Sequence, residues 1–90
     1  MSGCSRILEI RNRRGLHARA SAKFVNLASQ LPAEVIVEKD GNRVTGTSIM
    51  GLMMLGAAMG DTIVIHCDGD GCGEALDQLA AMVEDKFGEE

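Results

Sequence analysis

The residues with the clearest chemical potential lie at the start of an expected helix. His17, one of only two histidines, stands just before a segment in which apolar side chains recur at helical spacing. A helix start presents unpaired backbone N–H groups and the positive end of the helix dipole, and this combination binds anions. Arg19 adds a full positive charge two residues further on. The pattern therefore predicts an anion-binding site with a nucleophilic imidazole inside it, where a phosphorylated histidine would be stabilised.

Basic side chains are concentrated around this histidine. Residues 1–24 contain a single acid, Glu9, and these basic residues: Arg6, Arg11, Arg13, Arg14, Arg19 and Lys23. A histidine at a helix start is often only a solvated residue or a weak cap, and a charged run is often only a solvated surface. The crowding of cations in this one segment favours the interpretation that the segment neutralises a phosphate.

Composition excludes several classes of protein. Ninety residues, 46% of them hydrophobic, suffice for one small folded domain, which we expect to span residues 1–90. No apolar run approaches the roughly 20 residues of a membrane-spanning helix, and no signal-peptide segment is present, so we expect a cytoplasmic protein without membrane insertion. The lack of Trp and Tyr and the net charge of −4 argue against nucleic-acid binding. The basic region around His17 instead favours docking to an acidic protein surface.

The cysteines leave an alternative open. Cys4, Cys67 and Cys72 are an odd number, which fits a reducing compartment better than a disulfide framework, so we expect structural or incidental thiols. His66 lies beside Cys67 and offers a metal-binding or redox alternative. The spacing between Cys67 and Cys72 matches no recognised zinc pattern, and we predict neither a metal site nor a cofactor.

Periodicity predicts secondary structure in the order βαββαβα. Strands are expected at residues 5–11, 34–38, 43–45 and 62–66, and helices at residues 18–30, 49–55 and 73–87. Asp40 and Gly41 form a hairpin turn signal, and Pro32 ends the first helix. Three helices packed on one face of a small, mostly antiparallel sheet would bury the apolar stripes, so the expected class is α+β.

The short helix expected at residues 49–55 is unusually apolar. Ser48 or Thr47 would be its N-cap, while Gly51 weakens it by about 1 kcal/mol. Its apolar residues are too many to bury on one face: Ile49, Met50, Leu52, Met53, Met54 and Leu55. They are either mainly core, with methionine filling gaps, or partly an exposed surface of the kind that binds several partners. A phosphate on Ser48 would add roughly −1.5 to −2 charges beside that surface.

Two segments resemble signatures of one known family. Residues 15–19 (GLHAR) resemble the active-site motif of HPr, the histidine phosphocarrier family of the bacterial phosphotransferase system. Residues 48–53 (SIMGLM) resemble the family's second signature, around its regulatory serine. The resemblance covers nearly the whole chain and implies an open-faced sandwich, in which three helices cover one face of a four-stranded antiparallel sheet of order 1-4-2-3.

The resemblance also implies a relay. Enzyme I, charged from phosphoenolpyruvate, would pass a phosphoryl group to Nδ1 of His17, and His17 would pass it to a histidine of an enzyme IIA protein. Arg19 matches the arginine that steadies the phosphoryl group, and Ser48 matches the serine modified by HPr kinase/phosphorylase in bacteria that have this enzyme. The positions that match partner-docking residues are Ile49, Met50 and Met53. Such a protein is a carrier rather than an enzyme, and we expect a monomer.

One position departs from the commonest family pattern. Ala20 stands where many members carry proline, but alanine is a good helix former and should preserve the geometry. This variant resembles proteobacterial members, including the nitrogen-related branch, so sugar transport and nitrogen regulation both remain open.

A rival hypothesis from another class is a small adaptor that binds helices through the methionine-rich surface, with His17 incidental.

Overall fold

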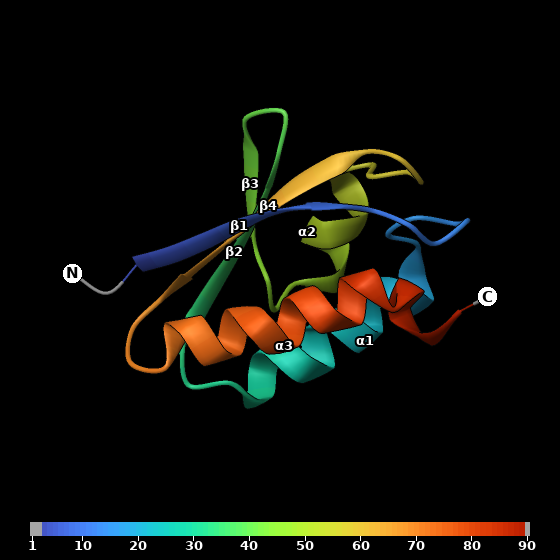
Figure 1. The fold of residues 1–90 in the computed structure, drawn as a ribbon. Helices are drawn as coiled ribbons and strands as arrows, with labels where there is room; N and C mark the ends of the chain where they lie inside the picture. The colour runs from blue at the N-terminus through green and yellow to red at the C-terminus, as the bar shows by residue number, and fades with distance from the viewer. Residues whose placement is uncertain (1–2, 90) are drawn as a thin grey trace.

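The computed structural model describes residues 3–89, in which one sheet is covered on one face by helices (Figure 1). The strands are β1 (Gly3–Glu9), β2 (Glu34–Lys39), β3 (Asn42–Thr45) and β4 (Thr62–Asp68), and the helices are α1 (Ala18–Gln30), α2 (Ile49–Met54) and α3 (Cys72–Glu84). All strand pairs are antiparallel, in the order β1-β4-β2-β3. The expected α+β class and strand order are confirmed.

The alternation along β4 separates the two faces of the sheet. Ile63, Ile65 and Cys67 are buried beneath the helices, whereas the residues between them are only partly buried. Successive strand residues point to opposite faces, so His66 lies on the open face of the sheet, away from the helices. β4 is a central strand that pairs with both β1 and β2, and it therefore carries the middle of the core.

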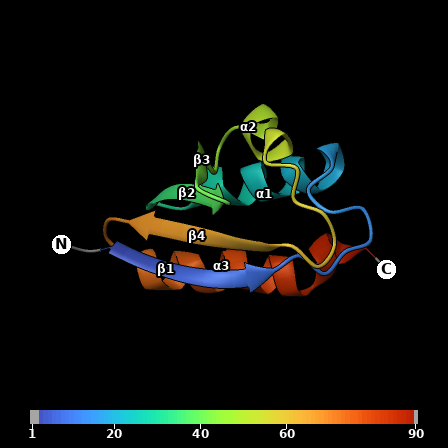
Figure 2. The same cartoon turned by 90° about the horizontal axis from the view of Figure 1, so that it is seen from above.

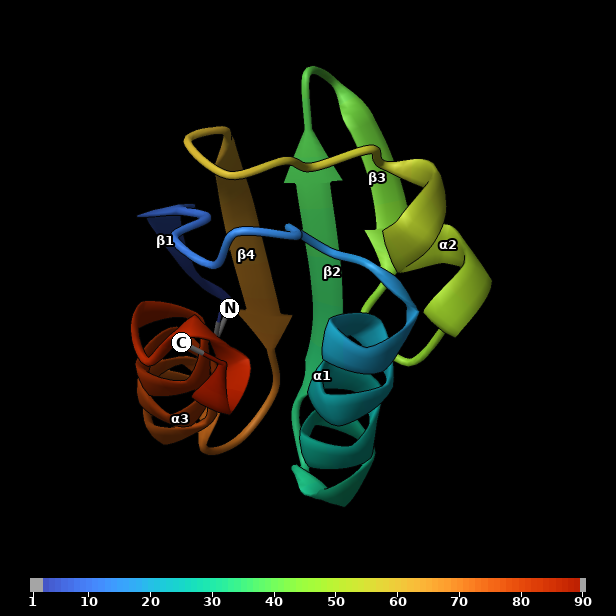
Figure 3. The same cartoon turned by 90° about the vertical axis from the view of Figure 1, so that its right-hand side faces the viewer.

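The two long helices lie side by side across the covered face (Figures 1 and 3). Their apolar stripes supply the helical half of the core, chiefly Ala20, Phe24, Ala28, Leu76, Leu79 and Val83. The bounds predicted for α1 are confirmed, since the helix begins at Ala18 and ends at Gln30, just before Leu31 and Pro32.

α2 packs against the first long helix and the β3 edge of the sheet (Figures 2 and 3). Leu52 is completely buried, whereas Met50 and Met54 are more than 70% exposed. The helix ends at Met54, one residue earlier than expected, and Leu55 is its C-cap. Both interpretations of the apolar segment are therefore partly correct, because one side enters the core and the other faces outward.

The chain after α3 differs from the expected helix through Phe87. α3 ends at Glu84, and a 3₁₀ turn, η1, covers Lys86–Gly88. Its three residues all have positive φ, between 55° and 77°, so the chain turns back instead of extending the helix. Phe87 is nevertheless buried, as its apolar spacing suggested. The prediction of burial is confirmed, and the prediction of a helix there is wrong.

The first strand begins and ends earlier than expected. β1 runs from Gly3 to Glu9 rather than from residue 5 to 11, and its first residues pair with the last residues of β4. α3 starts just after β4 and returns beside β1, which brings the Cα atoms of Cys4 and Cys72 to 6.0 Å. This separation suits a disulfide, and the two residues form one.

The cysteine expectations are corrected accordingly. The odd number of cysteines argues against a disulfide framework, but Cys4 and Cys72 are joined, and only Cys67 is free among residues 3–89. Burial raises the pKa of the Cys67 thiol. His66 and Cys67 point to opposite faces of the sheet, so they cannot share a metal ion. Within residues 3–89, no three ligating side chains are placed to hold a metal, and none of the helices is long and apolar enough to cross a membrane.

Candidate functional site

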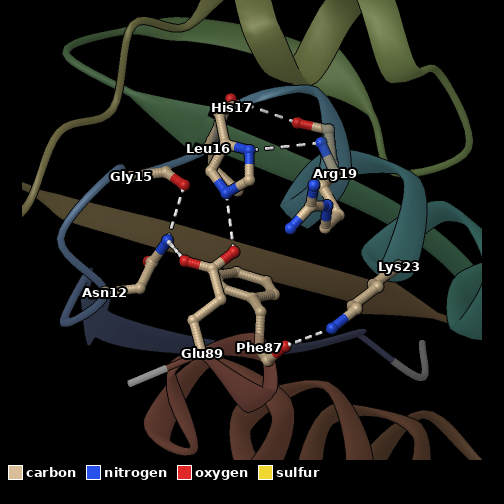
Figure 4. Close-up of polar contacts among 9 residues, drawn as sticks. Asn12, Gly15, Leu16, His17, Arg19, Lys23, Phe87 and Glu89 are labelled. Atoms are coloured by element: carbon tan, nitrogen blue, oxygen red, sulfur yellow. Dashed lines mark hydrogen bonds and ion pairs between the residues drawn. The ribbon is translucent and has the colours of Figure 1, made fainter.

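His17 is the N-cap of α1. Its backbone is extended, with φ of −75° and ψ of −179°, and its carbonyl accepts the first helical hydrogen bond, from the Ser21 N–H at 2.9 Å. Its Nδ1 accepts a hydrogen bond from the backbone N–H of Arg19 at 3.3 Å (Figure 4). The imidazole therefore occupies the position of a capping side chain, and its Nδ1 faces the positive end of the helix.

Gly15 and Leu16 fix the loop that presents this histidine. Gly15 has a φ of +66°, and a Cβ atom there would collide with the carbonyl oxygen of Ala57. The same carbonyl accepts a hydrogen bond from the Leu16 N–H at 2.9 Å, and the Leu16 side chain is buried. Because Ala57 follows α2, the loop before α1 is attached directly to the segment that carries the methionines.

A glutamate from the C-terminal turn contacts the other side of the imidazole. Oε2 of Glu89 lies 2.6 Å from Nε2 of His17, and Oε1 accepts from Nδ2 of Asn12 at 3.1 Å (Figure 4). Asn12 is completely buried and also donates to the carbonyl of Gly15 at 2.7 Å. Its Oδ1 has no hydrogen-bond partner within residues 3–89. The histidine, the preceding loop and the chain end therefore form one hydrogen-bonded network.

The charge of Glu89 is stabilised by this network. Desolvation raises its pKa, but the hydrogen bonds from His17 and Asn12 outweigh this effect and leave the pKa below its ordinary value of 4.5. Glu89 is therefore a carboxylate at neutral pH and accepts, rather than donates, both hydrogen bonds.

Three arginines share a shallow hollow with this carboxylate: Arg13, Arg14 and Arg19. Lys23 lies one helical turn further on and donates to the carbonyl of Phe87 at 2.8 Å. Arg6, in contrast, pairs with Asp77 of α3 at 2.6 Å and does not belong to this group. The cationic cluster predicted from the sequence thus forms in part, next to Nδ1 and the helix amides.

Ser48 is the N-cap of α2, as expected. Its Oγ accepts from the Gly51 N–H at 2.9 Å. The residues matched to docking positions, Ile49, Met50 and Met53, are all exposed, and so is Met54 of the same helix. We call the surface of these four residues of α2 the methionine patch. α2, which carries this patch, packs beside α1, the helix that His17 caps (Figures 2 and 3).

Two members of the site were missed by the sequence analysis. Glu89 belongs to an acidic chain end that reads as solvated, and 72 residues separate it from His17. Asn12 lies in a polar stretch with no apolar periodicity to predict that it is buried. Its position three residues before Gly15, whose φ is positive, was the only local signal of a turn held by a side chain.

The fold and the site together define a class of protein. An open-faced βαββαβα sandwich carries a partly buried imidazole at a helix N-terminus, beside a hollow lined by three arginines and one carboxylate. Such a site can accept and hold an anionic group. The family model described as "PTS HPr component phosphorylation site" matches residues 4–85. This chain belongs to the HPr family of phosphocarrier proteins.

Individual relatives agree with this assignment. The phosphocarrier protein HPr of Neisseria meningitidis is 51% identical over 82 residues, covering 91% of this chain and 92% of the relative. The phosphocarrier protein NPr of Shewanella violacea is 38% identical and covers 99% and 98%. The crystal structure of HPr from Thermoanaerobacter tengcongensis is 42% identical, with a TM-score of 0.92 and coverage of 97% and 98%.

Proposed function

We propose that this protein is a single-domain phosphocarrier of a phosphoenolpyruvate-dependent phosphotransferase system, with His17 as the residue that is phosphorylated. The observation that carries the proposal is the position of Nδ1. It lies at the N-terminus of α1, 3.3 Å from a backbone N–H and beside the arginine hollow. Phospho-enzyme I donates the phosphoryl group to His17, and a histidine of an enzyme IIA protein receives it from His17, in the cytoplasm.

The geometry suits acceptance of a phosphoryl group. The hydrogen bond between Nδ1 and the Arg19 N–H is long for its type, so it is weak and can be exchanged. When Nδ1 bonds to phosphorus, a phosphoryl oxygen can accept from the same N–H. The Arg19 guanidinium then supplies charge-assisted hydrogen bonds to the other oxygens. Phosphoryl transfer requires mainly such positioning and charge stabilisation.

The methionine patch is the proposed docking surface for both partners, through Ile49, Met50 and Met53. Ser48 is the proposed regulatory phosphorylation site for a HPr kinase/phosphorylase. Both features adjoin the His17 loop through the contact between Ala57 and Leu16. Whether the carrier serves sugar transport or nitrogen regulation depends on which enzyme IIA accepts from it, since both HPr and NPr relatives are similar to this chain.

A labelling experiment tests the proposal. The protein is incubated with enzyme I and phosphoenolpyruvate labelled on phosphorus, and the label is expected on this chain only when both are present. The linkage is expected to be a phosphoramidate, lost in mild acid and retained in base. No label, or an acid-stable ester, contradicts the proposal.

Sedimentation before and after labelling tests the expected monomer, because one related structure, with a TM-score of 0.76, is an HPr dimer.

A further inference from the structure

The chain end that carries Glu89 is built into the molecule. Phe87 is buried, and its carbonyl accepts a hydrogen bond from Nζ of Lys23 on α1. The consecutive positive φ angles of Lys86, Phe87 and Gly88 then turn the chain toward the start of α1. Glu89 is consequently delivered to His17 by a packed turn, and its side chain is only 18% exposed.

The two oxygens of Glu89 have different partners. Oε1 accepts from Asn12, whose buried amide is itself oriented by its bond to the Gly15 carbonyl. Oε2 is thereby held 2.6 Å from Nε2 of His17. An ionised carboxylate has only acceptors, so the hydrogen in this contact belongs to Nε2.

The opposite nitrogen of the ring has the complementary role. Nδ1 accepts from the Arg19 N–H, so it carries a lone pair and no proton. The two contacts therefore select one tautomer, with the proton on Nε2 and the nucleophilic lone pair on Nδ1. The charged groups that face this ring and its carboxylate are Arg13, Arg14, Arg19 and Lys23.

We propose that Glu89 is a positioning residue that keeps the proton on Nε2 of His17 throughout the phosphoryl relay, an inference that rests on the proposed function. On acceptance, the Nδ1 lone pair bonds to phosphorus while the donor's nitrogen–phosphorus bond breaks. The ring then carries a positive charge, which the Glu89 carboxylate balances. On donation, the electrons of the Nδ1–phosphorus bond return to Nδ1. The ring leaves as neutral imidazole, and no proton needs to enter or leave the site.

Without the Nε2 proton the leaving group would be an imidazolate anion, which departs far less readily. Glu89→Gln is the variant that removes the carboxylate charge at constant shape. The single amide oxygen of glutamine can accept from His17 or from Asn12, but not from both. Glu38→Gln is the matched control, because Glu38 contacts Nε2 of His66 at 2.8 Å on the open face of the sheet.

The test has two readouts. Nitrogen NMR of the unphosphorylated ring at pH 8 is expected to show the Nε2–H tautomer in the wild type and a mixture of tautomers for His17 in Glu89→Gln. Transfer from the phosphorylated protein to an enzyme IIA is expected to slow about tenfold in this variant, as for loss of one charged hydrogen bond. The pH above which transfer declines is expected to fall by about one unit. Glu38→Gln should leave transfer and the His17 tautomer unchanged.

The failure of each proposal is distinguishable. If His17 in Glu89→Gln keeps the wild-type tautomer, or if transfer keeps its wild-type rate and pH profile, the role of Glu89 is overturned. If the wild type accepts no label, the phosphocarrier proposal fails, and so does the relay role that rests on it. Glu89→Gln should stay folded and be only slightly less stable than the wild type at neutral pH, since it loses the contacts of one carboxylate, and Glu89→Asp should recover part of the pH profile.

Discussion

The molecule contains two histidine–glutamate pairs that look alike locally and differ in what surrounds them. Nε2 of His17 contacts Glu89 at 2.6 Å, and Nε2 of His66 contacts Glu38 at 2.8 Å. In the first pair both side chains are 18% exposed, and in the second both are 29% exposed. The first joins a helix start to the chain end, and the second joins neighbouring strands on the open face of the sheet.

The two pairs differ in what contacts Nδ1, the second nitrogen of each ring. They also differ in the second group that contacts each carboxylate. Nδ1 of His17 faces a helix amide, whereas no backbone amide bonds to the His66 ring within residues 3–89. Oε1 of Glu89 accepts a hydrogen bond from the buried amide of Asn12, whereas Oε1 of Glu38 lies 3.3 Å from Nε of Arg43. The His66 pair is therefore a partly solvated cross-strand contact of small energetic value. Of the two pairs, the His17 pair alone places its second ring nitrogen against a helix N-terminus and beside a hollow lined by three arginines.

The largest expected difference between the two regions is in labelling by enzyme I and phosphoenolpyruvate. His17→Ala is expected to abolish it, because the nucleophile is removed, while His66→Ala should remain within about twofold of the wild type. The His17→Ala protein should stay folded, with a loss of about 1 kcal/mol from the missing N-cap. If folded His17→Ala protein is labelled at the wild-type rate, His17 is not the residue that accepts the phosphoryl group.

The arginines beside the two pairs should differ next. Arg19→Ala is expected to slow phosphoryl acceptance about tenfold to a hundredfold, which corresponds to losing one or two hydrogen bonds to a charged group. Arg43→Ala removes the equivalent cation beside Glu38 and should leave the rate unchanged. Rapid-quench kinetics with saturating enzyme I measures both rates, and thermal unfolding should show little change in either variant. An unaffected Arg19→Ala would mean that the backbone amides alone stabilise the phosphoryl group.

The loop and helix start around His17 could be predicted from the sequence because they are formed by residues that are close together in the chain. A glycine with positive φ, an N-cap and the helix amides are all produced by residues 15–21, so their geometry follows from neighbouring residues. The contacts of Glu89 and Asn12 depend on where a distant turn arrives after packing, and periodicity carries no information about that. The Cys4–Cys72 disulfide was missed for the same reason, since 68 residues separate the two cysteines.

A variant at Ser48 tests whether the surface that contacts enzyme I extends from His17 to the start of α2. Ser48→Asp should keep the α2 cap, because Asp also accepts at an N-cap, and should be stable for the same reason. The added charge should weaken enzyme I binding about threefold to tenfold at low salt, through repulsion by an acidic partner surface. Ser5→Asp is the matched control, since Ser5 is exposed and pairs directly with His66 on the open face.

Stopped-flow association at two salt concentrations separates the causes of this effect. The slower association of Ser48→Asp should largely disappear at 1 M salt, where the Debye length is about 3 Å. Ser5→Asp should associate like the wild type at both concentrations. An affinity loss in Ser48→Asp that is equal at low and high salt would contradict the electrostatic account and favour a rearranged α2.

The smallest expected effect is the acid dependence of stability that the two carboxylates contribute. For Glu38 the hydrogen bond from His66 lowers the pKa, burial raises it, and Arg43 lowers it further, with a net pKa below 4.5. The pKa of Glu89 is lowered likewise. A lowered pKa in the folded protein gives stability that is present above the ordinary pKa and is lost as the pH falls through the lowered value. Urea unfolding at pH 5, 4 and 3 should therefore show Glu38→Gln and Glu89→Gln less stable than the wild type at pH 5, with both differences shrinking toward pH 3. A difference that stays constant or grows toward pH 3 would show that the carboxylate charge is not what stabilises that pair.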